Sequence, residues 1–127
     1  MKKVSWMSGI EFLPVYVGCT DNEAAYAREV RRLTRKSHPS PCVTPGATAT
    51  AHRYYNGRGE LVVLVGFNRN RISKGPAAFR AGIFAHEAVH AADWIFEEIG
   101  EDKPSDEFRA YLTQRITWWF FQEYHAK

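Results

Sequence analysis

The most strongly β-forming stretch of the chain reads Leu61-Val62-Val63-Leu64-Val65-Gly66-Phe67. Its β-branched and apolar residues predict a buried strand. A second strand candidate, Thr48 to Tyr55, precedes it, and the residues between them, Asn56-Gly57-Arg58-Gly59, are a turn signal. Together these three segments predict a β-hairpin.

On the N-terminal side of this hairpin the sequence predicts one strand and one helix. The strand runs from Ile10 to Val17, and its proline suggests an edge or a bulge. The helix covers Asn22 to Lys36, with apolar residues at helical spacing, and either Thr20 or Asp21 can cap it.

On the C-terminal side a polar loop, Asn68 to Gly75, leads into a helix pair. Pro76 suits the first turn of a helix that runs to about Ile99 and stops at Gly100. Ser105 is a good N-cap for the last helix, whose broad apolar face comprises Phe108, Leu112, Ile116, Trp119 and Phe120. The element order predicts an α+β fold, with a small antiparallel or mixed sheet packed on helices.

Size and composition indicate one globular domain over residues 1–127. The chain is 45% hydrophobic, 24% charged and rich in aromatic residues, which is typical of soluble proteins with a real core. We expect no signal peptide, no membrane partner and an intracellular setting. Two cysteines, Cys19 and Cys42, form no metal-knuckle pattern, and whether they pair is left open.

The net charge of +3 does not by itself indicate a nucleic-acid partner. Positive residues gather in two places, Arg28-Arg31-Arg32-Arg35-Lys36 and Arg69-Arg71-Lys74. We interpret them as a solvated helix face and a loop, because the chain shows neither a known binding module nor a denser basic stripe. We therefore expect no nucleic acid to bind.

The motif that carries chemistry is His86-Glu87-Ala88-Val89-His90, inside the predicted helix of residues 76–99. Residues four apart share one helix face, so both imidazoles can reach one ion. Zinc prefers such nitrogen ligands, and a catalytic zinc keeps one position for water. Glu87 is placed to serve as general base. The alternative, a polar face with two solvated histidines, is disfavoured because the helix is otherwise apolar.

A zinc site needs a third protein ligand, and the best candidate is Glu107. It lies seventeen residues after His90, near the start of the next helix, and a short connection makes the two helices antiparallel neighbours. Asp106 is the serious competitor, although a role beside the helix N-terminus explains it equally. The weaker rivals are Asp93, Glu97, Glu98 and Asp102.

At these residues the sequence resembles the gluzincins, zinc peptidases with H-E-x-x-H on one helix and a Glu ligand on the next. It is most similar to small zincin-like proteins of phages and prophages. The resemblance covers roughly the last third of the chain: His86-Glu87-Ala88-Val89-His90-Ala91-Ala92-Asp93, Gly100-Glu101-Asp102 and Glu107-Phe108-Arg109-Ala110-Tyr111-Leu112. It implies a minimal zincin-like fold, Zn²⁺ bound by His86, His90 and Glu107, and a location in the cytoplasm of a bacterial host.

The chain departs from the family at Tyr111, where the larger enzymes carry an Asp that orients a ligand histidine. We expect the phenol either to stabilise a tetrahedral oxyanion or to pack as a core tyrosine. Large substrate-binding domains are absent, which favours narrow specificity. The resemblance implies a zinc-dependent peptidase that acts on a peptide or protein substrate; the alternative is a zincin-fold binding module with little turnover.

The remaining histidines and aromatic residues receive weaker assignments. His52 either lines the cleft as an electrophile or is a surface residue. His38 and His125 receive no role. Four bulky aromatics follow one another, Trp118-Trp119-Phe120-Phe121; at least one must point away from the core, which allows an oligomer or partner contact.

Overall fold

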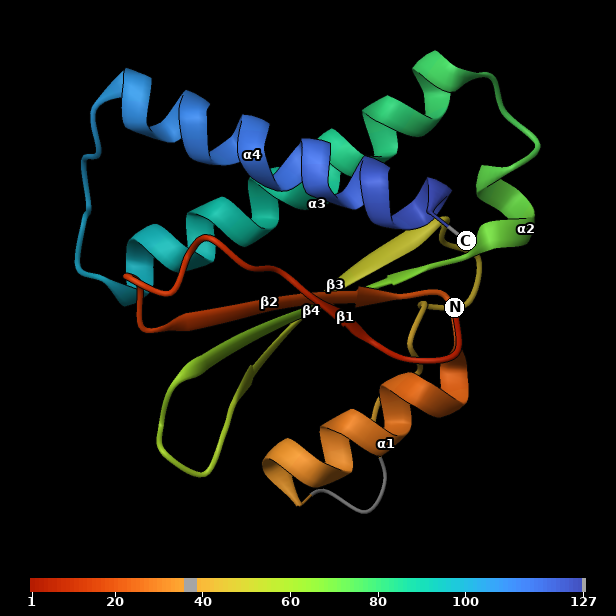
Figure 1. Ribbon diagram of the computed structural model, residues 1–127, viewed down its shortest axis with the longest axis horizontal. Coiled ribbons are helices and arrows are strands. Elements are labelled where there is room, and N and C mark those ends of the chain that lie inside the picture. The colour runs from red at the N-terminus through yellow and green to blue at the C-terminus, as the bar shows by residue number, and fades with distance from the viewer. Residues whose placement is uncertain (36–38, 127) are drawn as a thin grey trace.

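The computed structural model describes residues 1–35 and 39–126 and has an α+β fold (Figure 1). Its elements in chain order are β1 (Ser5–Trp6), β2 (Val15–Thr20), α1 (Glu23–Thr34), β3 (Ala49–Tyr55), β4 (Leu61–Phe67), α2 (Arg69–Ile72), α3 (Ala77–Glu98) and α4 (Asp106–His125). Lys36 and His38 lie outside the described residues. The predicted fold class and the predicted order of the main elements are confirmed.

The sheet in this part of the chain is mixed, with strand order β1-β2-β4-β3. The predicted hairpin is confirmed: β3 pairs with β4 antiparallel, with Tyr55 opposite Leu61. Strand β2 runs parallel to β4, and β1 is antiparallel to β2. Helix α1 covers one face of this sheet, while α3 and α4 cover the other (Figure 1). Strand β3 is therefore an edge strand that is accompanied by α3.

The predicted strand from Ile10 to Val17 is wrong at both ends. Strand β2 begins at Val15 and continues to Thr20, whereas residues 11–14 form a turn in which the N–H of Leu13 donates to the carbonyl oxygen of Ile10 (2.9 Å). Local sequence could not show this, because β2 begins where its parallel partner β4 begins, at Leu61. Strand β1, only two residues long, was not predicted.

The start of α1 also differs from the prediction. Its N-cap is Asn22, whose Oδ1 accepts from the N–H of Ala25 (2.9 Å). The two predicted caps have other partners: Thr20 Oγ1 accepts from the N–H of Asn22 (3.1 Å), and Asp21 pairs with Arg69. The helix ends at Thr34, two residues earlier than predicted.

The helix pair is close to the prediction. Pro76 is the N-cap of α3 rather than its first residue, and the helix ends at Glu98, shortly before Gly100 with φ of 74°. Ser105 caps α4 as predicted, since its Oγ accepts from the N–H of Phe108 (3.2 Å). The predicted polar loop of residues 68–75 contains a short helix, α2.

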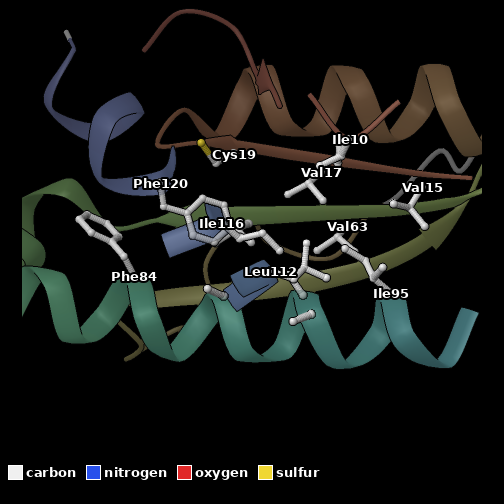
Figure 2. Packing of buried hydrophobic residues seen from close by; sticks show 14 of the residues in the cluster. Ile10, Val15, Val17, Cys19, Val63, Phe84, Ile95, Leu112, Ile116 and Phe120 are labelled. Atoms are coloured by element: carbon white, nitrogen blue, oxygen red, sulfur yellow. The ribbon is translucent and has the colours of Figure 1, made fainter. Parts of the chain in front are cut away.

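The main core lies between the sheet and the pair α3 and α4. Alternate residues of β2 and β4, such as Val17 and Val63, belong to one buried cluster with Phe84 of α3 and Phe120 of α4 (Figure 2). Burying each such side chain contributes about 1.5–3 kcal/mol. Trp118, by contrast, is 56% exposed, so the aromatic run does point one ring away from the core.

Both cysteines are free thiols inside the protein. Cys19 belongs to the core of Figure 2 and Cys42 packs against the opposite sheet face. Burial raises the pKa of the Cys19 thiol well above its usual range and that of the Cys42 thiol to about 12. None of the helices in the described part of the chain is long and apolar enough to cross a membrane.

Candidate metal centre

Helix α3 places the two motif histidines on its outer surface. Phe84, Ala88 and Ile95 point into the core, so the positions about half a turn away face solvent. His86 is 69% exposed at its side chain, and His90 is exposed beside it. The spacing of four residues thus puts both imidazoles on one open face, as the sequence predicted.

The Nε2 atoms of the two imidazoles lie close together. Their Nε2 atoms lie 3.3 Å apart, and the ring centroids lie 4.9 Å apart at an interplanar angle of 74°. Two nitrogen ligands about 2.0–2.1 Å from a tetrahedral zinc ion are roughly 3.3–3.4 Å apart. The separation of the two nitrogens therefore fits two zinc ligands. It is also within reach of a hydrogen bond between the rings.

Glu87 lies between this open face and the edge strand β3. It is only 5% exposed, and its Oε2 lies 4.0 Å from Nε2 of His86. Burial raises the pKa of the Glu87 carboxyl, and this effect is opposed by the charges of His86 and His90 and by a hydrogen bond from the backbone of Ala51 in β3. A carboxylate with a raised pKa accepts a proton more readily, which suits a general base.

The predicted third ligand, Glu107, is not brought to the histidines. Helix α4 begins beside the end of α3, where the ring centroids of Phe96 and Phe108 lie 5.2 Å apart. His90 lies six residues before Phe96, roughly 9 Å along the helix axis. Among residues 1–35 and 39–126, no three His, Cys, Asp or Glu side chains are grouped so that they could hold one metal ion. Glu107 as a ligand stays a prediction.

The other carboxylates that were considered as the third ligand bond to other side chains or lie further along the chain. Asp93 follows His90 by one turn on the same exposed face and accepts from Nη1 of Arg109 (2.8 Å). The remaining rivals lie further toward the end of α3 or beyond it: Glu97 pairs with Arg53, Glu98 accepts from Tyr55, and Asp102 and Asp106 are exposed. Asp93 is the carboxylate that the fold places nearest along the helix to His90.

The two proposed oxyanion contacts lie on other elements than the histidines, Tyr111 on α4 and His52 on β3. Tyr111 is 60% exposed on α4, so it is not a core tyrosine. His52 lies on the opposite face of the sheet, where its Nε2 is 2.7 Å from the carbonyl oxygen of Cys42 and its ring contacts Tyr26. The expectation that His52 lines the cleft is wrong, because its strand position points it toward α1, where its ring is half-buried.

A cavity of about 570 Å³ adjoins the histidine face. One wall is the segment 46–49 before and at the start of β3, and the other is the first half of α3 with Phe79 and Ile83. His86 and Glu87 complete the lining. The lining is mostly small or apolar, so this cavity can accept an apolar group next to the histidines.

Sequence reasoning missed two residues of this region, Trp94 and Arg53. Trp94 stacks on His90 with ring centroids 6.0 Å apart, and Arg53 of β3 lies over the Trp94 ring. Trp94 is four residues after His90, so helical spacing alone was enough to find it. The contact of Arg53 with α3 depends on the packing of the sheet, and no local signal indicates it.

Comparisons of this chain with the models of known protein families, with curated proteins and with solved structures found no match.

Proposed function

We propose that this chain is a zinc-dependent hydrolase, a peptidase of narrow specificity with a minimal zincin-like fold. One observation carries the proposal: the Nε2 atoms of His86 and His90 lie 3.3 Å apart on an open helix face, with the buried carboxyl of Glu87 beside them. As part of this proposal, the reaction takes place in the cytoplasm of a bacterial host, as expected from the resemblance to phage and prophage proteins.

The proposed roles follow from the positions of the side chains. His86 and His90 hold the metal through Nε2. A bound zinc ion supplies a Lewis acid and lowers the pKa of water toward about 7. Glu87 takes the proton of the attacking water and passes it to the leaving amine, and its raised pKa, caused by burial, favours this transfer.

The edge strand offers a place for the peptide. The N–H of Asn68 donates to the carbonyl oxygen of Thr48 (2.8 Å), and the register continues through Thr50 and Gly66. In an antiparallel ladder the alternate residues, beginning with Ala49 and Ala51, then direct their backbone groups away from β4, and there the backbone of Ala51 bonds to Glu87. A peptide that adds to β3 would lie along α3, with the apolar cavity at one end.

The third ligand is the open part of the proposal. Glu107 is the residue that the resemblance implies, and Asp93 is the carboxylate that lies one turn from His90. The zinc affinities of Glu107→Ala and Asp93→Ala separate these two assignments, because only loss of a true ligand lowers the affinity strongly. Asp106→Ala tests the competing assignment in the same way, and Glu101→Ala, at an exposed acid that is not a candidate ligand, is the control for a general effect of charge in this region.

The experiment that tests the proposal measures metal content. After gentle purification we expect near-stoichiometric zinc in the wild type and its loss in His86→Ala and in His90→Ala. His125→Ala is the matched control, since His125 is an exposed histidine near the end of α4 and should leave the zinc content unchanged. A folded wild type that takes up no zinc at micromolar concentrations would overturn the proposal.

A further inference from the structure

We infer that Trp94 is a positioning residue that fixes the ring of His90 for metal binding, and that Arg53 holds Trp94 in place. This inference rests on the proposed zinc site. Trp94 stands one helical turn after His90, and their rings are stacked, with centroids 6.0 Å apart and an interplanar angle of 27°. The stack contacts the ring while leaving Nε2 directed at His86.

A fixed ring matters here because His90 lies on an open face. Proteins usually orient a metal-binding imidazole by hydrogen-bonding its other nitrogen to a carboxylate or carbonyl group. Within residues 1–35 and 39–126, the side-chain hydrogen bond found for His90 is the one to His86. An exposed imidazole held only by its neighbour can rotate, so the aromatic stack supplies the missing restraint.

Arg53 connects this stack to the edge strand. Its Cζ lies 5.9 Å from the centroid of the Trp94 ring, a cation–π contact. Its Nη2 donates to Oε1 of Glu97 (2.9 Å), one turn further along α3. The side chain is 28% exposed, so water does not fully screen these contacts. Arg53 of β3 thus contacts Trp94, and Trp94 stacks on His90. These two contacts connect the strand to the candidate metal site.

The test compares zinc affinities, measured by competition with a chromophoric chelator at pH 7. Trp94→Leu removes the aromatic stack, and we expect about two- to tenfold weaker zinc binding, the usual worth of one aromatic pair. Trp94→Phe keeps a ring and should recover most of the affinity. Arg53→Gln should weaken binding by about two- to fivefold, the worth of an exposed cation–π contact.

The matched control is Trp118→Leu, because Trp118 is a solvent-exposed tryptophan that lies on α4. It should bind zinc like the wild type. Thermal unfolding of each variant without metal shows whether the fold is kept. If Trp94→Leu does not fold, the comparison of Trp94→Phe and Arg53→Gln with the wild type decides the question.

A second readout needs no metal. In the wild type the indole ring current should shift the ring-proton resonances of His90 upfield in the NMR spectrum. The shift should vanish in Trp94→Leu and persist in Trp94→Phe. A folded Trp94→Leu with wild-type zinc affinity, or with unchanged His90 resonances, would overturn the inference while leaving the zinc site intact. A wild type that binds no zinc would overturn both.

Discussion

The histidines on the two sides of the sheet have opposite surroundings. His52, on the α1 face, is half-buried, packed against Tyr26 and hydrogen-bonded to the carbonyl oxygen of Cys42. His86 and His90, on the far side of α3, are exposed and face each other. An imidazole whose nitrogen is already bonded inside the protein serves the fold, whereas two open imidazoles at ligand spacing are available to bind.

The same contrast applies to the acids beside them. Glu23, on the α1 side, accepts from the backbone N–H of Cys42 (3.0 Å) and so fastens the segment before β3. Glu87 also accepts a backbone hydrogen bond, from Ala51, but it is buried next to exposed histidines, and burial raises its pKa. A buried carboxyl costs free energy unless it is well paired, so its position beside two imidazoles favours a chemical role.

The largest expected effect concerns Glu87→Gln, which keeps the shape of the side chain and removes the base. Turnover should fall by about two to four orders of magnitude, the usual worth of a positioned general base, while zinc content stays at the wild-type level. The assay is a peptide library incubated with each protein and read by new chain termini.

Equal cleavage by wild type and Glu87→Gln, with zinc bound in both, would remove the peptidase assignment. It would leave the binding module as the better description of the histidine face.

A pair of substitutions tests the difference between the two histidine environments. His52→Ala should lower the free energy of unfolding by about 1–3 kcal/mol, because the Cys42 carbonyl loses its partner and the rings lose a contact. Zinc content should not change. His86→Ala should lose zinc but change the free energy of unfolding by no more than about 0.5 kcal/mol. Urea unfolding and metal analysis of both variants check this.

The comparison fails if His52→Ala releases zinc, or if His86→Ala in the metal-free protein is the less stable of the two.

The pH dependence of stability provides a finer test. Burial lowers the pKa of His52, although the contact with Cys42 and the charge of Glu23 oppose this. Below the ordinary pKa of about 6.5 the unfolded chain binds a proton that the folded chain does not, so stability falls as the pH drops from about 7 to 5. His52→Gln removes this titration.

We therefore expect the free energy of unfolding to decrease less between pH 7 and 5 in His52→Gln than in the wild type. Glu87 contributes equally to both proteins and cancels in the difference. Identical pH profiles would show that His52 is not buried as described.

The smallest effect is expected on the basic face of α1. Arg32 is 63% exposed and pairs with Glu29, and such surface pairs contribute about 0–1 kcal/mol. The double substitution Arg31→Ala, Arg32→Ala should therefore change stability by at most about 1 kcal/mol and leave zinc content unaltered. Salt-sensitive binding of DNA or RNA by the wild type, lost in the double variant, would contradict the interpretation of this face as solvated.

The features that were predicted correctly are those whose sequence signals act between near neighbours in the chain. The hairpin of β3 and β4 was predicted because its turn residues and its β-branched run act over a few neighbours. Ser105 was predicted as an N-cap for the same reason. The start of β2 was missed because a parallel partner far along the chain sets it. Helix spacing does not give the register between two packed helices, so the sequence alone could not place Glu107 relative to the histidines, and Glu107 as a ligand stays a prediction.

The sequence by itself determined that His86 and His90 share one helix face with Glu87 beside them, because helical geometry fixes residues four apart. Only the tertiary structure decided which way that face points, that β3 is the edge strand beside it, and that His52 lies on the other side of the sheet. It also decided that Arg53 reaches Trp94 and that α4 starts beside Phe96. These features depend on contacts between segments far apart in the chain, which helical and strand periodicity do not encode.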